Sequence, residues 1–151
     1  MKQSAGILLY RRISSETEFL LAHPGGPFWK SKDLASWSIP KGEFTNEENA
    51  LDAAIREFQE ETGLLLKGVF TELKPVKLKS GKIIYAWACE QDFDTESLVS
   101  NTFEMEWPPK SGKFISIPEV DEARWFNYEA AATHINERQK MLLEELIEIL
   151  A

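Results

Sequence analysis

Residues 42–64 read GEFTNEENALDAAIREFQEETGL, and this stretch decides how the other parts of the 151-residue chain are interpreted. Thr45 with Glu48 three positions later is a capping-box pattern, and Gly63 is a residue typical of the position just past a helix C-terminus. We therefore expect a helix over residues 46–62. Apolar residues recur along it at helical spacing and predict its core face: Leu51, Ala54, Ile55, Phe58 and Thr62.

A different face of the predicted helix carries three carboxylates. At 100° per residue, Glu57, Glu60 and Glu61 share this face with Ala50 and Ala53. Like charges three and four residues apart repel one another, and the small alanines leave room beside them. Clustered oxygen ligands suit hard cations such as Mg²⁺ and Mn²⁺. Taken alone, the same glutamates would also fit a solvated acidic face on a surface helix.

The wider spacing distinguishes these two interpretations. Gly42 is followed after five residues by Glu48, and after seven more by Arg56-Glu57-Phe58-Gln59-Glu60-Glu61-Thr62-Gly63-Leu64. This pattern matches the Nudix box at all nine of its fixed positions over 23 residues. Phe58 is bulkier than the usual aliphatic residue at its position. On this motif the chain resembles the Nudix hydrolase family.

The resemblance implies an α/β (α+β) fold, an α/β/α sandwich around a central mixed β-sheet. It implies one Nudix domain over residues 1–151, with its box at 42–64, and Mg²⁺- or Mn²⁺-dependent hydrolysis of a pyrophosphate bond. The substrate would be a nucleoside diphosphate linked to another group, either a nucleoside triphosphate or a dinucleoside polyphosphate. The alternative is a Nudix-fold module that senses a nucleotide without cleaving it. Such modules usually lose a box glutamate, whereas this chain keeps them all.

The family motif also implies roles for individual residues. Glu57, Glu60 and Glu61 match the metal-binding and catalytic carboxylates, and the backbone carbonyl of Lys41 matches a further metal ligand. Gly42 would then be small so that loop and helix can approach closely. The general base is either Glu57 or a glutamate outside the box. Arg56 belongs to the catalytic constellation, where we expect it to pair with Glu48 rather than to contact the substrate.

Outside the box, a few residues are candidates for the same site. The side chain of Lys41 is a candidate phosphate contact, and Trp29, in a Gly/Pro-rich loop, is a candidate for stacking on a base. Glu104, preferred over Glu106, is our candidate for a further glutamate supplied by a late strand. We interpret Glu43 as a surface carboxylate rather than a support for the metal site, and Lys82 as one of several solvated lysines beside a hairpin rather than a weak phosphate-attracting group.

Alternating or continuous apolar runs predict strands at residues 6–10, 19–23, 37–39, 82–93, 103–107 and 122–126. The strand at 103–107 should be half-buried. Residues 128–134 predict a helical turn or two, and residues 137–150 predict a final helix. In that helix the candidate core contacts are Met141, Leu142, Leu146, Ile149 and Leu150. The order of elements predicts a mixed sheet with helices on both sides.

Charge and cysteine usage limit the partners. The chain has 25 acidic and 17 basic residues, a net charge of −8, which disfavours a nucleic-acid polymer or an anionic membrane as partner. Residues 42–64 hold seven acids and one base, so most of the surplus lies in one segment. Cys89, the one cysteine, lies in an apolar run and reads as a buried thiol. We expect a cytoplasmic protein, monomeric or homodimeric, that acts on a small phosphorylated nucleotide.

Overall fold

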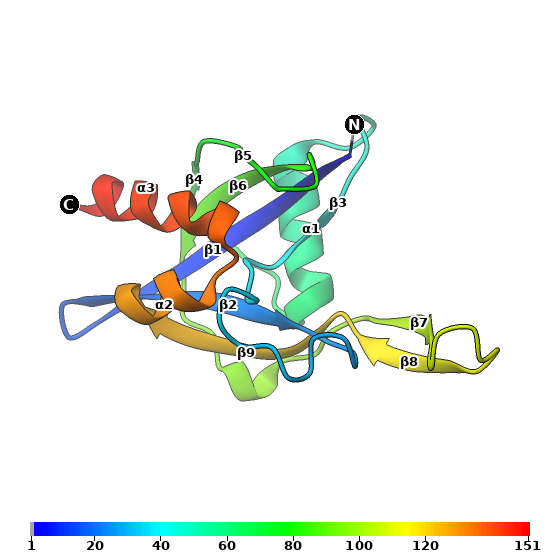
Figure 1. Cartoon of the computed structure of the whole chain (residues 1–151). Helices are drawn as coiled ribbons and strands as arrows, with labels where there is room; N and C mark the ends of the chain where they lie inside the picture. The colour runs from blue at the N-terminus through cyan, green and yellow to red at the C-terminus, as the bar shows by residue number, and fades with distance from the viewer. Residues whose placement is uncertain (1) are drawn as a thin grey trace.

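A mixed β-sheet forms the centre of the molecule (Figure 1), whose structure is a computed structural model that describes residues 2–151. The main strands lie in the order β4-β6-β1-β2-β9, with β3 paired to β1 and β5 paired to β6. β1 and β6 are parallel, and the other pairs are antiparallel. The strands of this seven-stranded sheet are β1 (Gln3–Ile13), β2 (Glu16–Pro24), β3 (Lys41–Glu43), β4 (Phe70–Glu72), β5 (Val76–Lys77), β6 (Ile83–Glu90) and β9 (Val120–Asn127).

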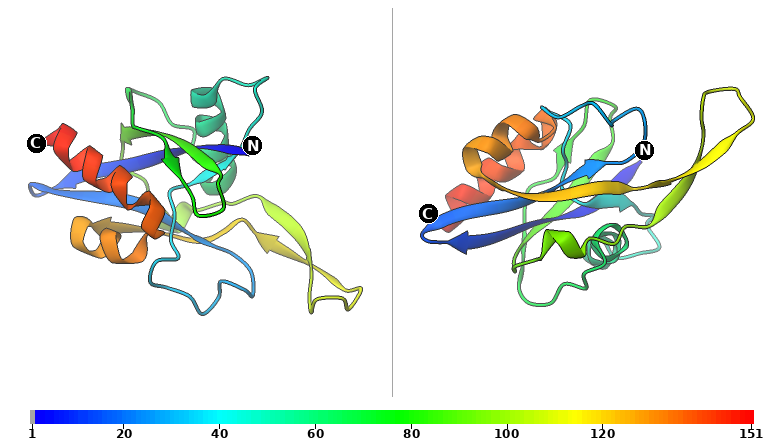
Figure 2. Two further views of the ribbon diagram at one scale, coloured as in Figure 1. Left: turned by 45° about the horizontal axis from the view of Figure 1, so that its top comes forward. Right: turned by 90° about the horizontal axis from the view of Figure 1, so that it is seen from below.

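Helices cover both faces of this sheet, as the sequence predicted (Figure 2). One face carries α1 (Ala50–Thr62), and the other carries α2 (Tyr128–His134) and α3 (Lys140–Leu150). Short 3₁₀ turns lie at Thr95–Ser97 and Glu137–Gln139. Among residues 2–151, no helix is long and apolar enough to cross a membrane.

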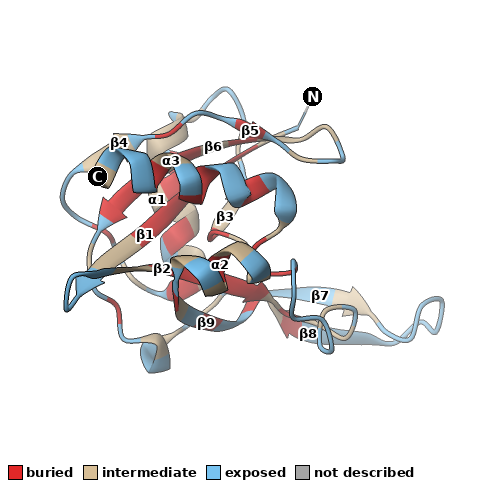
Figure 3. Cartoon of the chain, turned by 60° about the vertical axis from the view of Figure 1, so that its left-hand side comes forward, coloured by how far each residue is buried: buried red, intermediate tan, exposed pale blue. Residues whose placement is uncertain are grey.

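Strand alternation explains why the molecule has two cores. Successive side chains of a strand point to opposite faces, so β1 places Ile7 and Leu9 toward α1 and Leu8 toward α3. Phe58 of α1 is fully buried in the first core, and Leu142 of α3 is fully buried in the second. The buried residues accordingly follow the strands and the inner sides of the helices (Figure 3).

The box helix begins later than the capping pattern predicted. Asn49 is its N-cap, and the Asn49 side chain accepts a hydrogen bond from the Asp52 amide at 3.1 Å. Thr45 instead accepts from the Glu47 amide at 3.3 Å, which makes a local turn in the preceding loop. The prediction of a helix start at Thr45 was therefore wrong, because two residues in the segment are able to cap. The predicted C-terminus was right, since Gly63 adopts the left-handed conformation at φ +87°.

Two strand predictions need correction. Residues 37–39 do not form a strand; Trp37 and Ser38 make isolated bridges to Ile135 and Ala22. Residues 103–107 fall largely in β7 (Thr102–Glu106), which pairs only with β8 (Phe114–Pro118) in a separate two-stranded hairpin. This hairpin projects from the body of the molecule, so Phe103 and Trp107 are each 38% exposed rather than half-buried against the main sheet (Figure 1).

The final helix is also shorter than predicted. Residues 137–139 form a 3₁₀ turn, and α3 itself starts at Lys140. Leu142 and Leu146 are buried as expected, whereas Met141 and Ile149 are exposed. Cys89 on β6 is buried, which confirms its reading as an inert core thiol.

Candidate functional site

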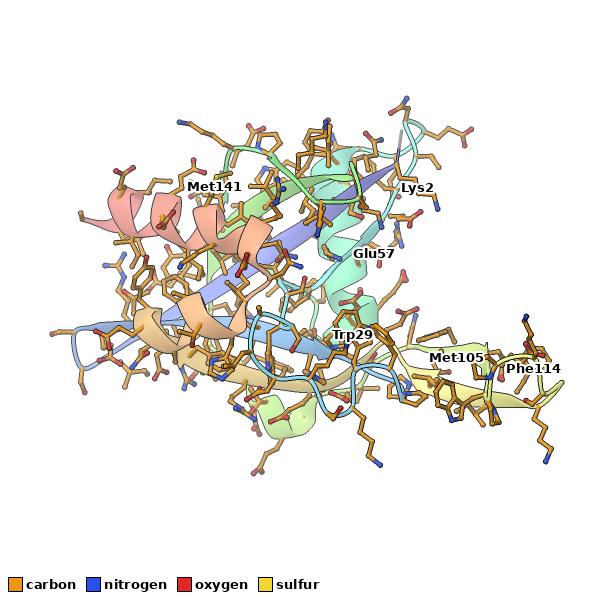
Figure 4. The ribbon with its side chains drawn as sticks, viewed as in Figure 1. Lys2, Trp29, Glu57, Met105, Phe114 and Met141 are labelled. Carbon is orange, nitrogen blue, oxygen red and sulfur yellow. The ribbon has the colours of Figure 1, made fainter. Side chains whose placement is uncertain are left out.

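A cleft of about 520 Å³ lies where α1 packs across β3 and the start of β1. Glu57, Glu60 and Glu61 of α1 line it together with Lys41 of β3. Glu119 also lines the cleft, from the single position between β8 and β9. The cleft therefore combines one wall of carboxylates with one wall of strand residues, and Figure 4 shows Glu57 in the middle of α1.

Gly42 allows helix and strand to approach closely enough to form this cleft. A Cβ atom placed on Gly42 would lie 1.9 Å from Glu57 Oε2 and 2.0 Å from Glu57 Cδ. Such distances are far below any van der Waals contact, so only glycine leaves space for the Glu57 carboxylate at this position. The prediction that Gly42 is small because loop and helix meet is thereby confirmed.

Arg56 organises the carboxylates. Its Nε and Nη2 atoms donate to the two carboxylate oxygens of Glu48 at 2.8 and 2.9 Å, which is a bidentate pair. Its Nη1 atom donates to Glu57 Oε1 at 2.9 Å and to Glu60 Oε2 at 2.8 Å. The predicted pairing of Arg56 with Glu48 is confirmed, and the structure adds two further acceptors from the helix.

Two carboxylates of the cleft, Glu57 and Glu61, are costly to ionise. Burial raises the pKa of Glu61 to about 8, with the negative charges of Glu57 and Glu119 adding to the effect and Lys41 opposing it. Burial and the charge of Glu60 likewise raise the pKa of Glu57, against the opposing effect of Arg56. Glu48 differs, because its hydrogen bonds to Arg56 hold its pKa below the ordinary value.

Lys41 supplies a positive charge inside the cleft. Burial lowers the pKa of its ammonium group, and the nearby Glu61 carboxylate opposes that shift. The buried negative charge on the α1 side nevertheless exceeds the positive charge facing it. A divalent cation would offset that excess. It would also lower the pKa of the carboxylates beside it, which is the opposite of the effect of burial.

The donor set fits a hard divalent cation. Glu57, Glu60 and Glu61 offer only carboxylate oxygens, and the strand residues beside them add backbone carbonyls. As they stand within residues 2–151, no three His, Cys, Asp or Glu side chains converge tightly enough to enclose a metal ion. Glu57 and Glu60 are both turned to Arg56 Nη1, so an ion would be held after these carboxylates rotate from the guanidinium.

The cleft includes some of the predicted site residues and excludes others. Lys41, Glu57, Glu60 and Glu61 are brought together, with Arg56 beside them. Glu104 is not: it is exposed on β7 and does not line the cleft. Figure 4 labels Met105 of the same strand, on the projecting hairpin.

Two further candidates also lie outside the cleft. Glu106 accepts hydrogen bonds from the Lys110 and Gly112 amides and thereby closes the hairpin tip. Trp29 stacks edge-on against Phe28 at 5.0 Å between ring centroids, and it is absent from the residues that line the cleft.

Glu119 is the site residue that sequence reasoning missed. Its backbone explains its position, because its amide donates to the Asn101 carbonyl at 2.8 Å and its carbonyl accepts from the Gly25 amide at 3.2 Å. These bonds tie the β8–β9 junction to the loop after Pro24 and to Asn101, the residue just before β7. The available signal was Pro118 directly before Glu119, since proline ends a strand and re-aims the residue that follows.

Comparison with known proteins identifies the family. The NUDIX domain model matches residues 2–146, so the chain belongs to the Nudix family and is a Nudix pyrophosphohydrolase. Members of this family typically depend on divalent metals. A relative from Rattus norvegicus, bis(5'-nucleosyl)-tetraphosphatase [asymmetrical], is 33% identical over 111 residues, covering 65% of this chain and 71% of its own. The corresponding Mus musculus protein is 30% identical over 111 residues, again covering 65% of this chain and 71% of its own.

Solved structures agree on the fold. The binary complex of a C. elegans Ap4A hydrolase superposes with a TM-score of 0.65 at 22% identity, covering 99% of this chain and 98% of that one. The NUDIX domain of Shewanella oneidensis NrtR, complexed with ADP ribose, gives a TM-score of 0.65 at 16% identity, covering 99% and 88%. The α/β/α arrangement with a mixed central sheet is therefore the Nudix fold.

Proposed function

We propose that this protein is a Mg²⁺- or Mn²⁺-dependent hydrolase of a nucleotide pyrophosphate bond, with a dinucleoside polyphosphate as the first-choice substrate and a nucleoside triphosphate as the second. The observation that carries the proposal is the cleft that unites Glu57, Glu60, Glu61 and Lys41. A cluster of half-buried carboxylates is destabilising unless cations offset it, and a polyphosphate is the anion that such cations attract.

In this proposal the metal is held by Glu57, Glu60 and Glu61, with the carbonyl of Lys41 as a further ligand. When bound, a divalent ion supplies neutralisation of the phosphate charge and a more acidic water. Arg56 holds Glu57 and Glu60 beside the cleft until a metal would draw them from the guanidinium, and Glu48 fixes Arg56. The guanidinium suits this purpose because its Nη1 atom reaches both Glu57 and Glu60 while Nε and Nη2 remain for Glu48.

A carboxylate must accept the proton of the attacking water. Two residues of the cleft are placed for this step, Glu57 on α1 and Glu119 at the β8–β9 junction. Glu119 replaces Glu104 as the candidate from outside the box, because Glu119 borders the carboxylates and Glu104 does not. The Lys41 ammonium would hold a phosphate oxygen, and the water would attack phosphorus to leave two phosphorylated products.

The choice of substrate class draws on two observations. The sequence Pro40-Lys41-Gly42 resembles the loop of the diadenosine-polyphosphate and diphosphoinositol groups, and the relatives from rat and mouse are named bis(5'-nucleosyl)-tetraphosphatases. Two lysines, Lys41 and Lys82, line the cleft. Two cationic positions suit a chain of several phosphates better than one compact group.

A substrate panel tests the proposal. Dinucleoside tri-, tetra- and pentaphosphates, nucleoside triphosphates, ADP-ribose and other nucleotide sugars are incubated with Mg²⁺ or Mn²⁺, and products are separated by chromatography. Glu61→Gln should abolish hydrolysis, whereas Glu47→Gln, an exposed glutamate of the same motif, should preserve it. Absence of hydrolysis with either metal would overturn the proposal. Tight nucleotide binding without hydrolysis would favour the sensing module instead.

A further inference from the structure

The lining of the cleft contains an ion pair that the sequence did not reveal. Lys82, just before β6, donates from Nζ to Glu43 Oε2 at 3.1 Å, and Glu43 ends β3. Both residues line the cleft. The Lys82 side chain is 24% exposed and that of Glu43 is 54% exposed, so the lysine is the more sheltered partner. The reading of these two residues as unrelated solvated charges is therefore corrected.

The pair lies further along the cleft than Lys41. On β3, Glu43 pairs with Ser4 and Lys41 pairs with Gly6, so the two residues lie two positions apart with Gly42 between them. That separation is about 7 Å along the strand. The Lys82 charge is near enough to Lys41 to lower its pKa, as like charges do. Lys41 and Lys82 thus form two successive cationic positions along one wall, opposite the carboxylates of α1.

An anion that reaches the second position must deal with Glu43. A short phosphate group held at Glu61 and Lys41 ends before Lys82 and leaves the ion pair intact. A longer chain extends to Lys82 and competes with the Glu43 carboxylate for the same ammonium group. The carboxylate is the exposed partner and is free to swing outward, whereas Lys82 is held beside the cleft.

We propose that Lys82 and Glu43 together select the length of the phosphate chain: Lys82 binds the phosphate furthest from the box glutamates, and Glu43 occupies Lys82 until that phosphate displaces it. This inference rests on the proposed function and specifies its substrate class as chains longer than a diphosphate. An anion that stops short of Lys82 leaves the ion pair intact, whereas a longer chain must displace the Glu43 carboxylate and so gains less from Lys82 than an unpaired lysine would give it.

The competing explanation is that the pair only fastens β3 to the β5–β6 hairpin. Partly exposed ion pairs contribute little to stability, about 0–1 kcal/mol. A structural role would make Glu43→Gln and Lys82→Gln behave alike. A selecting role makes them opposite, because Lys82→Gln removes the phosphate donor whereas Glu43→Gln frees it.

Binding of inorganic phosphate chains separates the two. Pyrophosphate, tripolyphosphate and tetrapolyphosphate are titrated by calorimetry into the Mg²⁺-loaded wild type and each variant. For Lys82→Gln we expect tetrapolyphosphate to bind about tenfold more weakly, from the loss of one charge-assisted hydrogen bond. Pyrophosphate should change less than twofold. Glu43→Gln should tighten tetrapolyphosphate and leave pyrophosphate nearly unchanged.

Lys77→Gln is the matched control, since Lys77 is an exposed lysine of the neighbouring β5 that does not line the cleft. It should alter none of the three affinities. Equal weakening of all three phosphates by Lys82→Gln, or parallel effects of the two cleft variants, would overturn the inference. These outcomes do not depend on hydrolysis. If the protein cleaves no nucleotide, the proposed function is refuted, but selection by phosphate-chain length can still be measured.

Discussion

Gly42→Ala tests the assembly of the site with one methyl group. The new Cβ would sit 1.9 Å from Glu57 Oε2, and an ordinary contact needs at least 3.4 Å, so the carboxylate must move by about 1.5 Å. Displacing a reacting group by about 1 Å costs on the order of 100-fold in rate. We therefore expect kcat/KM to fall about 100-fold, which corresponds to about 2.7 kcal/mol of lost transition-state stabilisation.

The fold should survive this change. The displaced atoms are the far end of a flexible side chain, and its bond to Arg56 is partly exposed, so the stability cost should stay within about 1 kcal/mol. For a domain of this size that is a shift in Tm of about 2–4 °C. Kinetics on the substrate identified by the panel and a thermal melt together measure both effects.

A double-mutant cycle gives the decisive measurement. In a Glu57→Ala background the methyl group meets no carboxylate, so Gly42→Ala should then cost almost nothing further in residual kcat/KM or in Mn²⁺ affinity. Two results would refute the reasoning. One is wild-type activity in a folded Gly42→Ala protein, and the other is an equal loss from Gly42→Ala in both backgrounds.

Three further predictions concern the charges and the cap of α1. Because burial raises the pKa of Glu61 to about 8 from an ordinary 4.5, ionising it opposes folding, so the metal-free protein should lose stability as pH rises from about 4.5 to 8. Glu61→Gln should flatten this dependence and raise Tm at pH 8.5 while abolishing activity, and a wild-type pH profile of Tm in the variant would contradict the assignment. Arg56→Lys should fail to restore the activity that Arg56→Ala loses, since an ammonium cannot make the bidentate bond to Glu48 while also holding Glu57 and Glu60. Steady-state kinetics of the two variants, each assayed equally far below its own Tm, measure this, and activity near the wild-type level in Arg56→Lys would contradict it. Asn49→Ala should cost about 1 kcal/mol of unfolding free energy and Thr45→Ala clearly less, as measured by urea denaturation, with the reverse order restoring the cap to Thr45.

The sequence predicted the chemistry of α1 better than its surroundings. The spacing of Glu57, Glu60 and Glu61 follows from helical geometry alone, and so does the reach of Arg56 to Glu60 four residues on. The glycines at 42 and 63 could likewise be assigned, because a close approach and a left-handed turn are local requirements. What a helix dictates within itself is legible from its residues.

The residues that the sequence could not place are those brought in from a distance. Glu104 and Glu119 are both glutamates after the box. Alternation along residues 103–107 favoured Glu104 over Glu106, and Glu119 lies outside every predicted element. The structure has Glu119 at the cleft instead, because β7 and β8 pair with each other and carry Glu104 away from the body. Which glutamate reaches the cleft depends on strand pairing over long range, and Pro118 before Glu119 marks only where β8 ends.

The Glu43–Lys82 pair was missed for a similar reason. The two residues are 39 positions apart, and they meet because β3 and β6 flank β1 on the same sheet. Ser4 of β1 is the shared neighbour, paired with Glu43 on one side and with Ile84 on the other. A register of this kind emerges only once the strand order is known.

The distribution of charge around α1 explains why one arginine cannot complete this site. Residues 42–64 carry seven acids against Arg56 alone, and Arg56 is already shared among Glu48, Glu57 and Glu60. Glu61 receives none of that guanidinium and instead shows the large rise in pKa that burial near other carboxylates produces. A protein selected for stability alone would replace Glu61 with an uncharged residue, since an uncompensated buried charge is expensive. Under the proposed function, divalent cations would offset the charge of this cluster, and an anionic substrate would enter the cleft through the same cations.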